Sequence, residues 1–268
     1  MTPCSFGRNN EKDTLKKQAP IDLLTLDAKS PLWKIYQEKC RRSAHFFIFG
    51  GVLRTKDEHD LQHPTKTLPQ EPYLRVLLDF LLVSGRMLNP RDAQWALAAG
   101  YEREFLDHLF TTSILFVEKS RQVMATWLVC CYLLWRARSY PHQLILVQSK
   151  REDDAANLVF TKEPTMARMS FMESTLPEPL RLIVWPKGGS YAHLYFPNGS
   201  HVWAIPEGGG IVRSNTPSVI FSDEAAYQPE FGDAFTAALP AIMGGGQGIF
   251  VSSANPGEYC DLVEGDIS

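Results

Sequence analysis

Three clusters of polar side chains in this sequence follow apolar, strand-like runs, and their residue types suit the handling of phosphate and of a metal ion. The first cluster is Lys119–Thr126 (KSRQVMAT), which joins an apolar run starting at Ser113 to a longer one reaching Arg138. A strand that enters a helix through a polar loop builds an anion site, because the first helical N–H groups lack internal partners and the helix dipole favours negative charge. The stretch therefore predicts a phosphate-binding loop.

The loop departs from the usual phosphate-loop pattern, G-x-x-x-x-G-K-[ST]. With Thr126 as the terminal hydroxyl residue, Ala125 stands at the usual lysine position and Met124 at the usual second glycine. The nearest cations are Lys119 and then Arg121, at the start of the loop. We expect Lys119 to reach back over the loop to the β- and γ-phosphates, and Thr126 to ligate Mg²⁺. An ordinary strand–loop–helix with solvated basic residues is an equally good reading of this stretch alone.

The second cluster is a pair of adjacent carboxylates, Asp223 and Glu224, at the end of the β-branched and aromatic run that starts at Ser218. In phosphate-loop ATPases an acid at such a strand end holds Mg²⁺, and a neighbouring group positions the attacking water. Because the backbone turns at the end of a strand, we expect Asp223 to face the metal and Glu224 to face the γ-phosphate. Many strands simply end in solvated acids, so this motif alone is only moderately specific.

The third cluster ends the apolar run that starts at Gly248 and consists of Ser252, Ser253 and Asn255. If this strand lies beside the Asp-Glu strand, these side chains are placed to sense the γ-phosphate. A plain turn at Asn255–Gly257 is the alternative. Three such strand ends in this order favour an ATPase.

Lys119–Trp127, Phe221–Ala226 and Ser252–Pro256 resemble the three ATPase motifs of the large terminase subunit, the motor that packages DNA into the heads of tailed bacteriophages. The displaced lysine, the Arg-Gln pair and the final threonine resemble that family's deviant phosphate loop more than a helicase loop. The resemblance covers residues 45 to 260. Taken together, its motifs are specific.

The resemblance implies an α/β fold of the P-loop NTPase type with an additional strand and a catalytic glutamate: a mostly parallel central sheet flanked by helices, with an N-terminal helical arm. It implies ATP and Mg²⁺ as cofactors, with Thr126 and Asp223 as metal ligands, Glu224 as the residue that orients water, and Ser252 to Asn255 as the coupling motif. The loop residues implied to contact the ATP phosphates are Lys119, Ser120, Arg121, Gln122, Val123, Met124, Ala125 and Thr126.

Arg213 lies eleven positions before Glu224, where similar terminases place an arginine finger that acts on the neighbouring subunit. Such a charge can stabilise the transition state by ~10³–10⁵ in rate. Arg121 competes as a finger supplied in cis, and a surface arginine beside the flexible glycine loop at 207–214 is the alternative for Arg213. Both arginines are therefore candidate catalytic residues, together with Lys119 and Glu224.

Composition limits the possible partners and compartment. The chain has 268 residues, is 44% hydrophobic and 21% charged, and has a net charge of −3. That balance argues against a generally basic nucleic-acid coat, so DNA contact must come from a local patch or from several copies in a ring. Five cysteines without C-x-x-C spacing indicate reduced thiols. No apolar run reaches the ~18 residues of a membrane span, and we expect a viral assembly intermediate in the host cytoplasm.

We expect an N-terminal arm and helix at 1–44 and an ATPase domain at 45–268, without the nuclease domain of full-length terminases. The partners that the resemblance implies are double-stranded DNA, the portal protein, the small terminase subunit and further copies in a ring, expected to be a pentamer, on the procapsid. Two other functions stay open. A superfamily-2 helicase or translocase fragment requires a second motor domain, and a catalytically inactive capsid-docking module would have a loop spoiled at Met124 and Ala125.

Several further elements are predicted from local patterns. Pro31 starts a helix that runs to Arg42, and a second helix opens at Pro72 and ends near Arg86. One helix is expected from Arg151 to about Arg168, and a strand at Arg181–Trp185. The remaining predictions are short helices at 90–112, a hairpin about Pro197–Ser200 and a helix from Pro229 to Met243.

Two small groups of residues have weaker functional signals. Tyr73 and Gln70 are candidates for adenine contact, although their spacing differs from the terminase pattern. His59 and His63 have i,i+4 spacing but no acidic or cysteine partners, so a metal site there is poorly supported.

Overall fold

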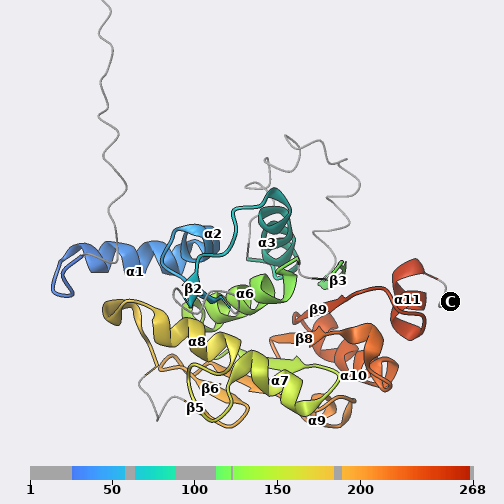
Figure 1. Ribbon diagram of the computed structural model, residues 1–268. Coiled ribbons are helices and arrows are strands. Elements are labelled where there is room, and N and C mark those ends of the chain that lie inside the picture. The colour runs from blue at the N-terminus through green and yellow to red at the C-terminus, as the bar shows by residue number, and fades with distance from the viewer. Residues whose placement is uncertain (1–25, 58–63, 88–112, 122, 184–188, 266–268) are drawn as a thin grey trace, which may run out of the picture.

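The computed structural model describes residues 26–57, 64–87, 113–121, 123–183 and 189–265 (Figure 1). The expected helices at 90–112, the His59–His63 pair and Gln122 of the loop lie outside the described residues. Among the described residues, no helix is both long enough and apolar enough to span a bilayer.

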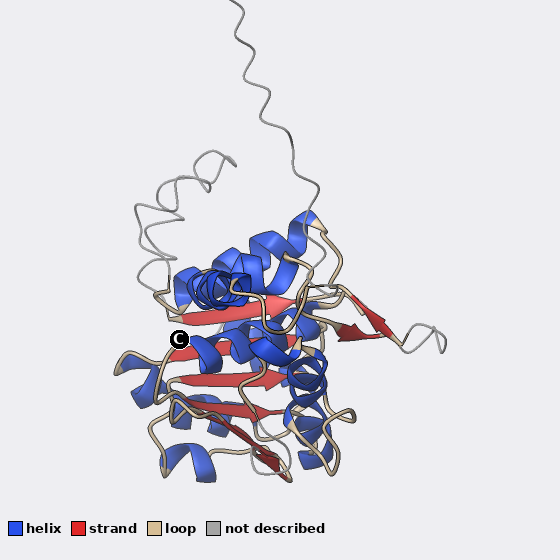
Figure 2. Cartoon of the chain, turned by 90° about the vertical axis from the view of Figure 1, so that its left-hand side faces the viewer, coloured by secondary structure: helices blue, strands red, loops and turns tan. Residues whose placement is uncertain are grey.

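The central sheet has seven strands in the order β3-β9-β8-β4-β7-β6-β5, with helices packed around it (Figure 2). In chain order the strands are β3 (Ile114–Glu118), β4 (Leu144–Gln148), β5 (Gly189–Ser190), β6 (His193–Tyr195), β7 (His201–Ala204), β8 (Val219–Asp223) and β9 (Gln247–Ser252). The first five strands of the spatial order are parallel, and β5 and β6 continue the sheet antiparallel. The predicted mostly parallel sheet is confirmed, and β9 is the additional strand between β3 and β8.

The two faces of the sheet bury different helices, because successive strand residues point to opposite sides. One face, which includes Phe221 and Val251, shares a core with α6 (Ala125–Ser139), α7 (Glu152–Val159) and α8 (Arg168–Thr175). The other face, which includes Ile220 and Phe250, packs with α10 (Phe231–Met243) and α11 (Glu258–Glu264). The parallel strands therefore have helices on both sides, and their carboxyl ends meet along one edge.

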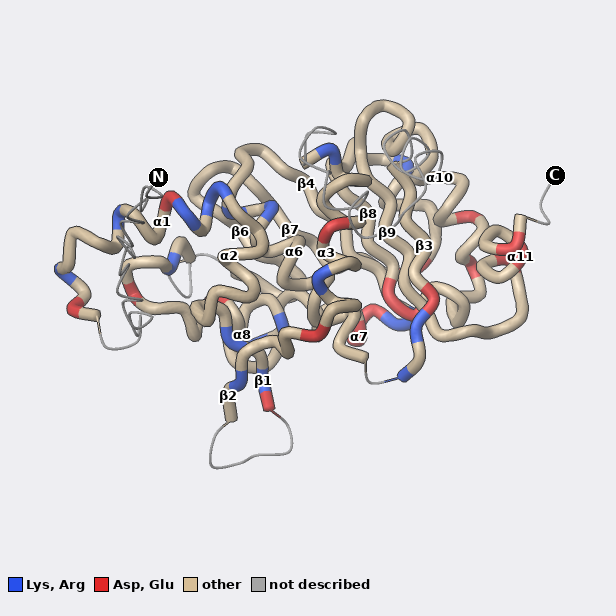
Figure 3. Tube along the Cα trace, turned by 90° about the horizontal axis from the view of Figure 1, so that it is seen from above, with Lys and Arg blue, Asp and Glu red and all other residues tan. Residues whose placement is uncertain are grey.

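The N-terminal helices α1 (Leu32–Arg42), α2 (Ala44–Phe49) and α3 (Pro72–Ser84) join the core that contains α6. Trp135 of α6 donates from Nε1 to the carbonyl of Cys40 in α1 at 2.9 Å. Basic residues recur along α1 (Figure 3), with only Glu38 as an acid in that helix. A separate two-stranded ribbon pairs β1 (Thr55–Lys56) with β2 (Thr65–Lys66).

Three local predictions differ from the structure. The helix expected from Arg151 to Arg168 is two helices, because α7 ends at Val159 and α8 starts at Arg168. Pro164 lies between them, and proline disfavours helical backbone in the residue before it and lacks an N–H donor. The described part of the predicted strand at 181–185 is not a strand and follows the short 3₁₀ helix η2 (Glu178–Leu180). The glycine loop contains the short helix α9 (Gly210–Arg213).

The hairpin prediction is confirmed by the antiparallel pairing of β6 with β7. The Asn198 side chain donates to the carbonyl of Ala137 at 2.8 Å and to that of Tyr140 at 3.1 Å. Gly199 has φ +80°, a left-handed conformation that glycine adopts readily. The asparagine therefore ties the turn to the end of α6, and the glycine closes it.

Candidate nucleotide-binding site

The predicted phosphate loop lies between β3 and α6, at the carboxyl edge of the sheet. The backbone N–H of Lys119 donates to the carbonyl of Ser252 at 2.9 Å, which fixes the start of the loop to β9. The loop ends at Met124, which has φ 58° and ψ 10° and precedes α6. This left-handed conformation costs a non-glycine residue roughly 1–2 kcal/mol. Met124 occupies the position where the usual pattern has glycine, so the fold keeps a glycine-type turn with a bulkier residue.

The helix that follows the loop is buried on nearly all sides, as its apolar sequence predicts. Cys130 and Cys131 are fully buried, and desolvation raises the pKa of the Cys130 thiol to about 12 and that of Cys131 well above its ordinary value. These thiols are core residues without acid–base chemistry at neutral pH. The rigid helix fixes its own first turn, where Thr126 lies, against the sheet.

Thr126 and Asp223 meet across the α6 face of the sheet. Thr126 Oγ1 donates to Asp223 Oδ1 at 2.9 Å, and both residues are buried. Desolvation raises the pKa of Asp223, although Lys119, the Thr126 hydroxyl and Arg168 each act to lower it. A hydroxyl beside a carboxylate is an oxygen donor set that fits Mg²⁺, which takes few protein ligands because it also binds water and substrate phosphates. Among the described residues, no group of three or more His, Cys, Asp or Glu side chains is placed to hold a metal ion.

Glu224 points to the other side of the loop, toward Lys119. Its backbone is left-handed, with φ 54° and ψ 41°, directly after β8 ends at Asp223. Lys119 Nζ lies 3.0 Å from Glu224 Oε1, and the two side chains are 11% and 30% exposed. The two adjacent acids are thus separated, with Asp223 held by a hydroxyl and Glu224 by a cation. The structure brings Lys119, Thr126, Asp223 and Glu224 together at one place.

The third motif braces the turn that carries Glu224. Ser252 Oγ accepts from the backbone N–H of Ala226 at 3.1 Å, and Asn255 Nδ2 donates to the carbonyl of Ala226 at 2.8 Å. Ser253 Oγ lies 3.4 Å from the hydroxyl of Tyr227, at the surface. Since Ser252 also accepts from the loop through its carbonyl, β9 connects the phosphate loop to the turn after Asp223.

The two candidate arginines are both exposed, one in the loop and one at the end of α9. Arg121 is exposed in the loop, as is Ser120. Arg213, at the end of α9, donates to Asp233 of α10, and the two side chains are 54% and 48% exposed. Asp233 Oδ2 also accepts from the backbone N–H of Gly209 at 3.0 Å. Arg213 is therefore held on the surface of its own chain.

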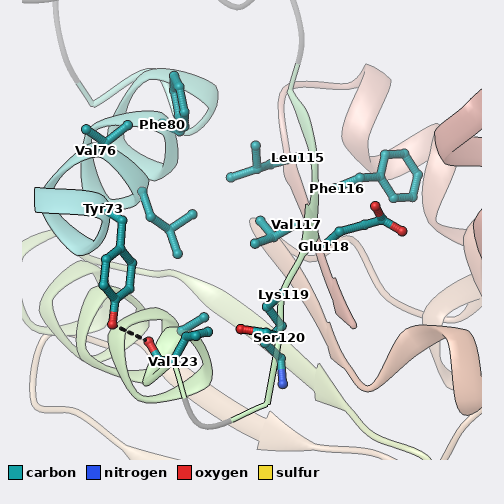
Figure 4. A pocket seen from close by; sticks show the side chains of 12 residues that line it. Tyr73, Val76, Phe80, Leu115, Phe116, Val117, Glu118, Lys119, Ser120 and Val123 are labelled. Carbon is teal, nitrogen blue, oxygen red and sulfur yellow. Dashed lines mark hydrogen bonds between the residues drawn. The ribbon is translucent and has the colours of Figure 1, made fainter. Parts of the chain in front are cut away.

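A cavity of about 800 Å³ adjoins the loop on the side of α3 (Figure 4). Its walls come from α3, β3 and the loop, and the labelled side chains include Tyr73, Phe80 and Lys119. Tyr73 Oη donates to the carbonyl of Val123 at 3.1 Å. Gln70, the other adenine candidate, instead donates to the carbonyl of Phe49 at 2.9 Å. Only Tyr73 of this pair lies at the loop.

Two site residues escaped the sequence reasoning. The Arg168 guanidinium lies 5.2 Å from the centre of the Trp127 ring in the first turn of α6, and Arg168 lowers the pKa of Asp223. Gln228 donates to the residues that precede Glu224. Neither residue belongs to a local motif, and the sequence pattern predicts Arg168 at the end of one long helix that the structure divides in two.

The strand order defines the fold class. A parallel sheet with a loop-and-helix unit after β3, an acidic strand end at β8 and one strand between them is the arrangement of P-loop NTPases of the additional-strand type. No protein-family model and no curated protein matches this sequence.

Among solved structures, the fold is similar to that of the HK97 bacteriophage large terminase, with a TM-score of 0.54 and 16% identity. The match covers 83% of this chain and 40% of that protein. The ATPase domain of the Thermus phage P74-26 large terminase gives 0.37 and 12% identity over 56% of this chain and 62% of that one. The large terminase of a thermophilic bacteriophage, in complex with ADP, gives 0.34 and 13% over 52% and 33%. The fold assignment rests on the HK97 protein and confirms the predicted resemblance at the level of the fold.

Proposed function

We propose that this chain is the ATPase motor domain of a viral DNA-packaging terminase, which couples Mg²⁺-dependent ATP hydrolysis to translocation of double-stranded DNA into a procapsid. The observation that carries the proposal is the meeting of Lys119 with Glu224 and of Thr126 with Asp223 at one sheet edge. Each pair joins the candidate phosphate loop to the acidic strand end, as a nucleotide site of this fold requires.

In this proposal ATP replaces both contacts. The ATP phosphates bind Lys119 and the loop N–H groups. The Glu224 carboxylate is thereby released from its ion pair with Lys119. Thr126 and Asp223 are the residues that would hold Mg²⁺, and the ion, when bound, neutralises charge on the phosphates. Glu224 then orients a water molecule for attack on the γ-phosphorus and accepts its proton, while the bond to the ADP oxygen breaks.

The Ser252–Asn255 segment couples the phosphate site to movement in this scheme. Ser252 contacts the loop through its carbonyl and the turn after Asp223 through its hydroxyl. Any movement of Lys119 or Glu224 that follows loss of the γ-phosphate would therefore be transmitted to β9 by direct contact. Residues 1–44 would be an N-terminal arm and helix that precede the ATPase domain at 45–268, with α1 packed against α6 of that domain. The site of assembly would be the host cytoplasm.

The ring of copies that we propose, with five as the expected number, gives Arg213 its role. Its partner Asp233 is as exposed as Arg213 itself, and exposed ion pairs contribute only about 0–1 kcal/mol. A neighbouring subunit's phosphate can therefore take the guanidinium from Asp233 at little cost. DNA contact would come from a local basic surface such as α1, and the portal protein and small terminase subunit would be the other partners.

The test is Mg²⁺-dependent ATP hydrolysis by this chain as protein concentration rises, with Glu224→Gln as the blank. Specific activity that climbs with concentration supports a site completed by Arg213 of a neighbour. Specific activity that exceeds the blank but does not change with protein concentration assigns the finger to Arg121 in cis. ATP binding without turnover above the blank at every concentration contradicts the ATPase proposal and favours the docking module.

A further inference from the structure

Gln228 is a buried glutamine beside the Asp223–Glu224 turn. The residue is 5% exposed, and its Nε2 donates to Ser222 Oγ at 2.7 Å and to the backbone carbonyl of Asp223 at 3.0 Å. One amide therefore binds both of the residues that precede Glu224. Ser222 and Asp223 point to opposite faces of the sheet, so the amide grips β8 from the α10 face while Asp223 faces α6.

The backbone that Gln228 grips has little local support. Glu224 is left-handed, which is uncommon for a residue other than glycine and is maintained only by surrounding contacts. The 3₁₀ turn η3 (Ala225–Tyr227) follows, and its bonds are from Tyr227 N–H to the Glu224 carbonyl at 3.0 Å and from Gln228 N–H to the Ala225 carbonyl at 3.1 Å. A single 3₁₀ turn is weakly bonded, so side-chain contacts determine where Glu224 points.

The orientation of the Gln228 side-chain amide shows which hydrogen bonds the fold retains. Gln228 Oε1 is buried and has no hydrogen-bond partner among the described residues. Gln228 also lines a cavity of about 440 Å³ that Asn255 and Tyr259 share. Turning the amide over would place Oε1 against the Asp223 carbonyl oxygen, and two acceptors cannot share a bond without a proton. The opposite orientation would lose the bond to the Asp223 carbonyl, so the amide keeps both donor bonds on the turn.

We propose that Gln228 is a positioning residue that fixes the Asp223–Glu224 turn, so that the Glu224 carboxylate projects across the sheet edge toward Lys119. The proposal rests on the ATPase function proposed above. Gln228 acts through Glu224 and does not touch the nucleotide. Its loss should leave ATP binding by the loop intact and misplace the group that orients water.

The test compares two matched variants of the full chain. Gln228→Met keeps the side-chain length and removes both donors. Gln247→Met is the control, because Gln247 is also buried and its Nε2 also donates to one hydroxyl, Ser84 Oγ, and one backbone carbonyl, that of Leu81. Misplacement of a catalytic group by about 1 Å can cost ~10²-fold in rate. We expect kcat to fall ~10–100-fold in Gln228→Met with KM for ATP unchanged, and kcat at 20 °C to be retained in Gln247→Met.

A second readout does not depend on turnover. Hydrogen exchange of the backbone N–H groups at 226–228, measured without nucleotide, should become faster in Gln228→Met and stay as in the parent in Gln247→Met. If Gln228→Met does not fold, Gln228→Leu takes its place, since leucine is of similar size and has no donor. A parent-like kcat, or parent-like exchange at 226–228, overturns the proposal. If the parent itself does not hydrolyse ATP, the ATPase proposal falls and the exchange measurement alone decides the role of Gln228.

Discussion

The two edges of the parallel sheet use polar groups in opposite ways. At the amino edge, Gln247 Oε1 accepts from Tyr132 Oη at 2.7 Å and from Arg136 Nη1 at 2.6 Å, while its Nε2 donates to two groups of α3. Arg136 also donates to Gln143 and to the carbonyl of Ser218. Tyr132, Arg136 and Gln247 are all buried, and Gln247 uses both ends of its amide.

The carboxyl edge differs in how its charged groups are paired and in its left-handed backbone. Lys119 and Glu224 share one contact, as do Thr126 and Asp223, and the turns on either side contain left-handed Met124 and Glu224. Each contact joins groups that a phosphate or a divalent cation can replace. Buried, fully paired groups make a structure rigid, whereas singly paired groups are free to exchange partners. In our proposal the amino edge is the fixed frame against which the carboxyl edge rearranges.

The largest effect is expected from a substitution at the carboxyl edge alone. Glu224→Gln removes the proton acceptor and the charge that pairs with Lys119, so kcat for ATP should fall ~10²–10⁴-fold. Stability should change little, because glutamine keeps an oxygen that can accept a hydrogen bond from Lys119 Nζ. Steady-state hydrolysis and urea unfolding measure the two effects. Glu258→Gln is the control, since Glu258 is exposed in the same region and its carboxylate accepts from the Gly232 N–H, away from Lys119. An equal loss of kcat there would contradict the assignment.

The next effect breaks the amino edge. Gln247→Met leaves Arg136, Tyr132 and Ser84 short of partners in a buried place, and each unpaired buried polar group costs ~1–3 kcal/mol. We expect the free energy of unfolding to fall by about 3 kcal/mol, as measured by urea titration. Turnover at 20 °C should stay near that of the parent. A large loss of kcat with unchanged stability would show that the two edges are not independent.

A smaller effect tests acid sensitivity outside both edges. His201 lies on β7 with its Nε2 2.7 Å from His193 Nδ1, and burial lowers the pKa of His201 to about 4. A histidine whose pKa is lower in the folded state binds fewer protons there than in the unfolded chain, so stability falls as pH drops below about 6.5.

Because His201 is only half-buried, solvent weakens the effect of its lowered pKa. We therefore expect the free energy of unfolding to fall by about 1 kcal/mol between pH 7 and pH 5. His201→Gln should remove most of that slope. An unchanged pH dependence of the urea midpoint in this variant would place the acid-sensitive group elsewhere.

The sequence predicts the elements of the carboxyl edge better than their supports. An apolar run followed by polar side chains is a local pattern, and it located β3, β8, β9 and the loop residues that meet there. The hydrogen bonds around Gln247 join segments that are distant in the chain. The hydrogen bonds of Gln228 span a turn whose conformation no local pattern indicates. The break between α7 and α8 was readable from Pro164, whereas the contact of Arg168 with Trp127 joins segments distant in the chain and follows from no local pattern.

The smallest expected effect tests whether left-handed backbone at the carboxyl edge is strained. Met124→Gly places the residue that favours φ 58° at the end of the loop, and His142→Gly does the same at φ 55° in a turn before β4. At Met124, relief of left-handed strain is offset by the greater freedom of glycine in the unfolded chain and by the loss of a side chain that packs against the core, so the unfolding free energy should change by less than about 1 kcal/mol. His142→Gly should gain up to about 1 kcal/mol in unfolding free energy. Only Met124→Gly should also change the affinity for ATP, because only that turn presents backbone N–H groups to the phosphates in our proposal. Equal shifts of ATP affinity in both variants would show that the loop conformation plays no special part in binding.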